Sequence, residues 1–159
     1  SVIEATRDAV HGDAGVFVDA LAANDLSLDL AEMTEVARFV TPLGPPRRFD
    51  TRFFVAAAPE GQIAQHDEEE VVQHVWIEPA VAIERFRNES FPMMSVTHRM
   101  LACLARYPLV KDLLAAAGEQ RPTQRVRVND PDGAYEVVLP GEPGYETAEV
   151  EIEHGWVRI

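Results

Sequence analysis

The chain has 159 residues, 47% of them apolar and 26% charged, a size and composition typical of one soluble globular domain with a buried core. Its formal net charge of −13 repels phosphate backbones and argues against general nucleic-acid binding, although a local arginine cluster or a bound cation still permits a small phosphorylated ligand. No run approaches the roughly 20 apolar residues of a membrane span and no leader is visible, so we expect a cytoplasmic protein with no membrane partner.

The beginning of the chain is predicted to be helical. Apolar residues recur at helical spacing over residues 2–10, and Asp13 is the candidate N-cap of a second helix that Asn24 and Asp25 end. Three strands are predicted next, over residues 36–40, 51–58 and 71–77, because β-branched and aromatic residues alternate there with polar ones.

Three helices are predicted in the middle of the chain. The first covers residues 80–87 with Pro79 in its first turn, and the second covers residues 96–107 with Ser95 as its N-cap. The third runs over residues 108–117 and is closed by Gly118. Cys103 lies in an apolar stretch of the second helix, where we expect a buried thiol.

The tail after Pro122 changes to strand patterning. Residues 125–128 and 135–139 alternate and are joined by five residues that end in Asp132-Gly133, which predicts a β-hairpin. A last strand is expected at either residues 149–152 or residues 156–159. We therefore expect two parts, residues 1–121 and a β-rich extension of residues 122–159 packed on them.

Three segments together carry a family resemblance. They are Thr41 to Ala56, which includes Arg48-Phe49-Asp50-Thr51-Arg52-Phe53-Phe54, then Asp67-Glu68-Glu69-Glu70, and finally Trp76-Ile77-Glu78-Pro79. This succession resembles the C-terminal part of a Nudix hydrolase, closest to the branch of the coenzyme A diphosphatases. The family's catalytic box, G-x5-E-x7-R-E-U-x-E-E-x-G-U with U apolar, does not occur, and the chain has no Arg-Glu dipeptide.

The resemblance covers roughly residues 2–107 and implies a partial Nudix fold. This is an α+β fold of the α/β/α sandwich type, with a mixed sheet flanked by helices and, here, a C-terminal hairpin extension. Thr97 matches the Thr of a Pro-Pro-Thr that opens a helix in relatives, whereas Met94-Ser95-Val96 departs from the double proline. The first strands of the sheet and the catalytic helix would lie upstream of Ser1.

The acidic run at residues 67–70 has two interpretations. Four adjacent carboxylates repel one another, so they form either a solvated turn or a site shared with a cation. The resemblance matches Asp67 and Glu70 to an Asp-x-x-Glu of the family and implies that both hold Mg²⁺ or Mn²⁺ and that Glu70 is catalytic. Such ions offset the charge that develops in diphosphate cleavage.

The basic group Arg47, Arg48 and Arg52 also has two interpretations. Arginine forks match phosphate oxygens, but these side chains can equally neutralise nearby acids on a very acidic protein. In an alternating strand Arg52 and Phe54 share one face, opposite Phe53. The resemblance implies that Arg48, Arg52 and Phe54 bind substrate.

Other site chemistries find no support in the sequence. The histidines show no ligand spacing on one helical face, and neither a nucleophile elbow nor a glycine-rich phosphate loop occurs. The leading hypothesis is a metal-dependent hydrolase of a nucleoside diphosphate derivative, with coenzyme A as one candidate, whose catalytic box is missing from this chain. The alternative is an inactive Nudix-like module that binds a small phosphorylated ligand or a protein. In either case a homodimer or a completing N-terminal segment would pair along an open sheet edge.

Overall fold

The computed structural model describes residues 6, 9–10, 13, 15–61, 66, 73–119, 121–129 and 135–159. It divides into two compact units, residues 1–32 and residues 33–159. The boundary expected after residue 121 falls inside the second unit. The class is mixed α+β, and no helix among the described residues is long and apolar enough to cross a membrane.

The first unit contains helix α2, Gly15–Ala23. Its predicted cap is confirmed, because Oδ1 of Asp13 accepts the N–H of Gly15 at 2.7 Å. The predicted end is confirmed as well, since Asp25 adopts a left-handed backbone with a φ of 52° and Nδ2 of Asn24 donates to the carbonyl of Ala20 at 2.8 Å. The helix predicted before it falls mostly outside the described residues.

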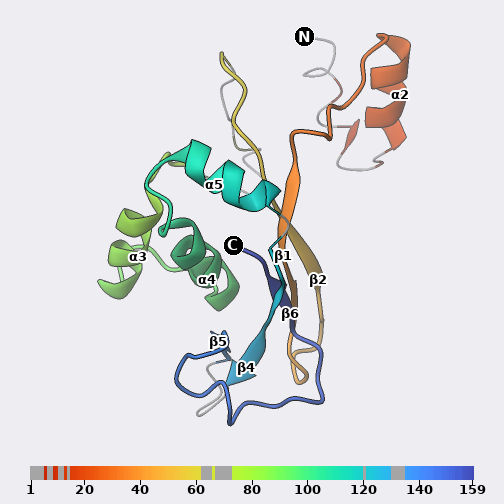
Figure 1. Ribbon diagram of the computed structural model, residues 1–159. Helices are drawn as coiled ribbons and strands as arrows, with labels where there is room; N and C mark the ends of the chain where they lie inside the picture. The colour runs from red at the N-terminus through yellow and green to blue at the C-terminus, as the bar shows by residue number, and fades with distance from the viewer. Residues whose placement is uncertain are drawn as a thin grey trace. The chain divides into compact units, whose positions relative to one another are not determined.

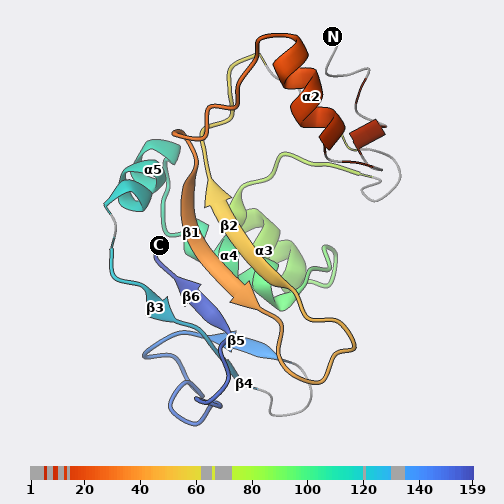
Figure 2. The ribbon, with the colours of Figure 1, turned by 90° about the vertical axis from the view of Figure 1, so that its right-hand side faces the viewer.

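A four-stranded sheet forms the centre of the second unit (Figure 2). Its strands are β1 Thr34–Val40, β2 Asp50–Val55, β3 Gln124–Arg125 and β6 Gly155–Val157, in the order β2-β1-β6-β3. Every described pairing is antiparallel, whereas the expected mixed sheet requires parallel neighbours as well.

Successive side chains of β2 point to opposite faces of the sheet, as predicted. Phe53 and Val55 pack against the core, and Phe53 meets Phe39 of β1 edge to face with ring centroids 5.4 Å apart. Arg52 and Phe54 are exposed on the opposite face. The strand stops at Val55 rather than at residue 58 because its partner β1 begins at Thr34, directly across from Val55.

Three helices cover one face of this sheet (Figure 1). They are α3 Pro79–Arg87, α4 Ser95–Leu104 and α5 Val110–Gly118. Pro79 occupies the first turn of α3 as predicted, but Ser95 is not the N-cap of α4. That position belongs to Met94, which makes no side-chain capping bond. Cys103 is buried against the sheet, as expected.

The strand predicted over residues 71–77 is wrong for the part that the structure describes. Residues 73–77 form no strand, and Trp76 is 74% exposed. Alternation alone does not make a strand, because backbone groups also need a neighbouring strand to pair with.

The C-terminal segment contributes to the sheet itself. The predicted hairpin is confirmed as β4 Arg127–Asn129 paired with β5 Glu136–Val138. The last strand overlaps the second of its two expected positions, residues 156–159, and not the first, residues 149–152. The resulting strand β6 lies between β1 and β3, so a tail strand occupies an interior position. The close pairing of β6 with β1 requires glycine at position 155, because a Cβ atom there would lie 1.8 Å from the carbonyl oxygen of Arg38.

Candidate functional site

A cavity of about 670 Å³ lies between the sheet, the start of α4 and the hairpin. We call it the hairpin pocket. Its walls come from the end of β1 and the following loop, from the first turn of α4, and from residues of the C-terminal segment. The lining residues are Phe39, Val40, Thr41, Pro42, Pro45, Arg47, Phe49, Thr51, Met94, Ser95, Val96, Val126, Val128, Tyr135, Val137 and His154.

The floor of the hairpin pocket is continuous with the hydrophobic core. Phe39, Val126 and Val137 belong to both. Strand register explains the arrangement, because Thr51 lies directly across from Phe39 and therefore presents its side chain on the same face. The cavity thus offers mainly apolar surface, as small-molecule sites do.

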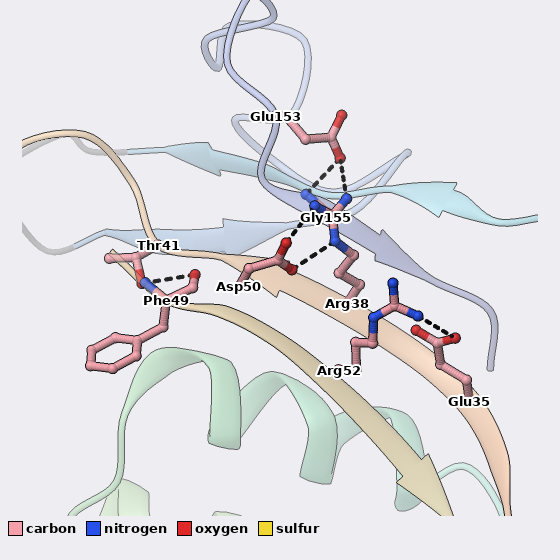
Figure 3. Close-up of polar contacts among 8 residues, drawn as sticks. All are labelled: Glu35, Arg38, Thr41, Phe49, Asp50, Arg52, Glu153 and Gly155. Atoms are coloured by element: carbon pink, nitrogen blue, oxygen red, sulfur yellow. Dashed lines mark hydrogen bonds and ion pairs between the residues drawn. The ribbon is translucent and has the colours of Figure 1, made fainter. Parts of the chain in front are cut away.

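The loop between β1 and β2 forms one wall of the hairpin pocket, and hydrogen bonds hold its two ends together. Thr41 and Phe49 exchange hydrogen bonds: the N–H of Thr41 donates to the Phe49 carbonyl, and Oγ1 of Thr41 accepts the Phe49 N–H, both at 2.9 Å (Figure 3). Nε of Arg48 donates to the Thr41 carbonyl at 2.8 Å. These bonds close the loop at its base.

The tip of this loop approaches the hairpin closely. Gly44 has a φ of 115°, and a Cβ atom there would lie 2.9 Å from the hydroxyl oxygen of Tyr135. Only glycine meets both requirements, the positive φ and the short approach. Gly44 therefore lets the loop lie against Tyr135 at the edge of the cavity.

His154 is the most unusual polar group in the hairpin pocket. Its residue is only 3% exposed, and Nδ1 has no hydrogen-bond partner among the described residues. Burial lowers the pKa of His154, and the positive charges of Arg48 and Arg125 lower it further, against opposing effects of the Val40 backbone and Glu153. The ring is therefore neutral at pH 7, and a neutral ring has one N–H donor and one acceptor nitrogen.

Two positive features accompany His154 in the hairpin pocket. Arg47 is an exposed lining residue, so its guanidinium is accessible to a ligand. The first turn of α4 supplies Met94, Ser95 and Val96, and no side chain caps its N–H groups. The N-terminal end of a helix carries partial positive charge. Together these features favour a negatively charged or hydrogen-bond-accepting group at the cavity.

An ion pair holds two walls of the hairpin pocket together. Arg99 of α4 contacts Glu142 through two bonds of 2.7 Å, and its Nη2 also donates to the carbonyl of Val137 in β5 at 2.7 Å. Oε2 of Glu142 accepts the N–H of Leu139 at 2.8 Å. Burial pushes the pKa of Glu142 upward, but the bonds from Arg99 and Leu139 outweigh it and leave the pKa below its usual value.

The arginine and aromatic residues predicted to bind substrate occupy other positions. Arg52 lies 3.4 Å from Glu35 on the exposed face of the sheet (Figure 3), and Phe54 shares that face. Beside them Arg38 makes a two-pronged contact with Asp50, at 2.7 and 2.8 Å. Arg52 thus fits the interpretation as a neutralising cation, and Arg48 ties the loop to Thr41.

The predicted metal and catalytic carboxylates, Asp67 and Glu70, lie outside the described residues. Among the residues that the structure does describe, no three His, Cys, Asp or Glu side chains converge as a metal site requires. His66 and His74 approach each other, with 2.7 Å between their Nδ1 atoms, although their sequence spacing did not predict a pair.

Comparisons with models of protein families, with characterised proteins and with solved structures found no match to this chain. The resemblance to Nudix hydrolases therefore rests on the sequence segments quoted above.

Sequence reasoning missed the main residues of the hairpin pocket. Arg47 was noted only as a member of the basic group, and His154 only as one of several scattered histidines. Nothing local distinguishes His154, because its burial depends on β6 entering the sheet beside β1. The predicted hairpin was the available signal, since its alternation marks Val126, Val128 and Val137 as inward-facing residues.

Proposed function

We propose that this chain is a ligand-binding module that holds a small molecule with an apolar body and an anionic head in the hairpin pocket. One observation carries the proposal: a mainly apolar cavity of about 670 Å³ is lined by His154, a buried histidine whose Nδ1 has no hydrogen-bond partner among the described residues. A buried polar group without a partner is costly, so a ligand that pairs with it gains affinity.

The chemistry of the hairpin pocket defines the ligand class. Phe39, Val126 and Val137 accept the apolar body. Arg47 and the uncapped first turn of α4 attract the anionic head, and the neutral ring of His154 exchanges one hydrogen bond with it.

A fluorescent probe with this chemistry tests the proposal. Anilinonaphthalene sulfonate combines aromatic rings with one anionic group, and we expect saturable one-to-one binding to the folded protein. Arg47→Gln should weaken probe binding by about fivefold, since an exposed charge contact contributes about 1 kcal/mol. Val137→Ala should weaken binding by removing apolar wall. Arg87→Gln on α3, which changes the net charge equally, serves as the matched control. Equal loss in Arg47→Gln and Arg87→Gln would place the probe elsewhere.

The second candidate is a metal-dependent Nudix-type hydrolase of a nucleoside diphosphate derivative. In its favour, the block that carries the resemblance also forms a wall of the hairpin pocket, through Phe49 and Thr51. Under this proposal Arg48, Arg52 and Phe54 bind substrate, and the fold is part of a sandwich with helices on both faces of its sheet. Asp67 and Glu70 would hold Mg²⁺ or Mn²⁺, which offsets charge during phosphoryl transfer.

Two measurements separate these candidates. Diphosphatase activity should be assayed on this chain alone and on the chain joined to its upstream sequence, and inactivity of both ends the hydrolase proposal. Calorimetry with a nucleotide, in the presence and absence of Mg²⁺, gives the second criterion. Affinity that does not depend on the metal favours the binding module.

The order of the sheet supports a proposal about self-association. β2 is an edge strand, with β1 on one side and no described strand on the other. Unpaired backbone groups along such an edge favour pairing with another chain. We therefore expect a homodimer, or a complex with a completing N-terminal segment. Sedimentation that shows a stable monomer of the isolated chain would contradict the homodimer.

A further inference from the structure

A second hollow in the same unit shares no residue with the hairpin pocket. It has a volume of about 550 Å³ and lies among the end of α4, the segment that enters β3, and the residues after β6. We call it the arginine cleft. Its lining residues are Arg106, Tyr107, Arg121, Pro122, Thr123, Gln124, Arg158 and Ile159.

The arginine cleft concentrates positive charge on an acidic protein. Three arginines from three separate segments line it, although the chain has only 14 basic residues and a net charge of −13. No Asp or Glu is among its lining residues, and Glu119 pairs with the lining residue Arg121 at 2.7 Å. Because like charges repel, three guanidinium groups in one cleft favour an anion among them.

The hydrogen bonds of these arginines leave donors for such an anion. Arg106 donates to the carbonyl of Cys103 through Nε and to a main-chain oxygen of Ile159 through Nη2. Arg121 is held by Glu119 and by the hydroxyl of Tyr107. Arg158 lies over the ring of Trp156 at 5.0 Å, and its buried Nε has no hydrogen-bond partner among the described residues. Neither Nη group of Arg158 bonds to a described residue, so these two groups are the donors that Arg158 has for an anion.

We propose that the arginine cleft binds a multiply charged oxyanion, namely a phosphate or diphosphate group. Nη1 of Arg106 and the two Nη groups of Arg158 make no hydrogen bond to described residues, and such guanidinium N–H groups pair well with phosphate oxygens. Hydroxyl groups of Tyr107 and Thr123 add neutral donors. The group is either a free anion or the terminal part of a nucleotide, and the two sources share this chemistry.

Trp156 provides a direct readout, because it lies next to Arg158. Trp76→Phe leaves Trp156 as the only tryptophan, since the chain has two. Titration of this variant with inorganic diphosphate should change the fluorescence and saturate, and the affinity should fall as salt is added. A parallel titration with a nucleoside diphosphate separates the two sources. Tighter binding of the nucleotide indicates that a nucleoside contributes contacts.

Substitutions in the Trp76→Phe background assign the binding to the arginine cleft. Arg121→Gln and Arg158→Gln should each weaken diphosphate binding by about tenfold, as expected for one charge-assisted hydrogen bond. Arg87→Gln on α3 is the matched control for net charge and should leave the affinity nearly unchanged. Thermal unfolding of each variant confirms that it is folded.

Glu119→Gln is expected to strengthen diphosphate binding, whereas a misfolded variant would bind more weakly. Removal of this carboxylate releases Arg121 from a competing contact, so the diphosphate affinity should rise by about threefold. Absence of saturable binding at millimolar diphosphate overturns the proposal, as does equal weakening by Arg87→Gln and Arg158→Gln. This site is independent of the hairpin pocket, and failure of either proposal leaves the other standing.

Discussion

The contact between Arg99 and Glu142 offers the sharpest test of how this unit is held together. It joins α4 to the turn after β5 across 43 residues of sequence. Arg99→Met keeps a side chain of similar length but removes two bonds to Glu142 and one to the Val137 carbonyl. The carboxylate of Glu142 then retains, among the described residues, only the bond from the Leu139 N–H.

The side chains of Arg99 and Glu142 are 17% and 36% exposed, so water compensates for part of the loss. We therefore expect Arg99→Met to lower the free energy of unfolding by about 3 kcal/mol, less than the upper range for a fully buried pair. For a unit of this size the loss corresponds to about 10 °C in melting temperature. Glu142→Gln keeps an acceptor and should cost about 1.5 kcal/mol.

Urea unfolding followed by tryptophan fluorescence measures these values. A double-mutant cycle of Arg99→Met and Glu142→Gln isolates the energy of the pair, which we expect to be about 1–2 kcal/mol. The pKa of Glu142 is lowered, so its stabilising effect is present at neutral pH and is lost as the pH falls below its ordinary value. A coupling energy below about 0.5 kcal/mol would refute the view that this pair joins α4 to β5.

Three further predictions follow from other contacts. Gly155→Ala should destabilise the protein by more than about 3 kcal/mol in urea unfolding, because φ is 104° and the new Cβ would overlap the Arg38 carbonyl. Arg52→Gln should cost less than about 1 kcal/mol in the same measurement, since its pair with Glu35 is exposed to solvent, and a larger loss would contradict that assignment. Stability should fall as the pH drops from about 7 to 5.5, by at most about 1.4 kcal/mol per unit from His154, because its lowered pKa means that the unfolded chain binds the proton first. His154→Gln should flatten this part of the stability profile, and an unchanged slope would show that other groups cause it.

Predictions that depend on neighbouring residues were the most successful. Asp13 caps its helix, Pro79 begins another, and the hairpin forms where the alternation around Asp132-Gly133 placed it. The strand prediction failed where a partner strand was needed, because residues 73–77 alternate but form no strand. The predicted cap of α4 was wrong as well, since Met94 rather than Ser95 occupies the N-cap position and makes no capping bond. The expected substrate residues Arg48, Arg52 and Phe54 stay a prediction, and Arg52 lies 3.4 Å from Glu35 on the exposed face of the sheet.

The sequence by itself determined the local elements, because capping, proline placement and alternation act within a few residues. It also determined which side chains of β2 share a face, since the period of a strand is two. Only the tertiary structure decided where the tail goes. β6 pairs with β1 across more than a hundred residues, and that pairing buries His154 beside the hairpin pocket. The same strand carries Arg158 to Arg106 and Arg121 in the arginine cleft. Such contacts arise from the packing of distant segments, and no local pattern of residues encodes them.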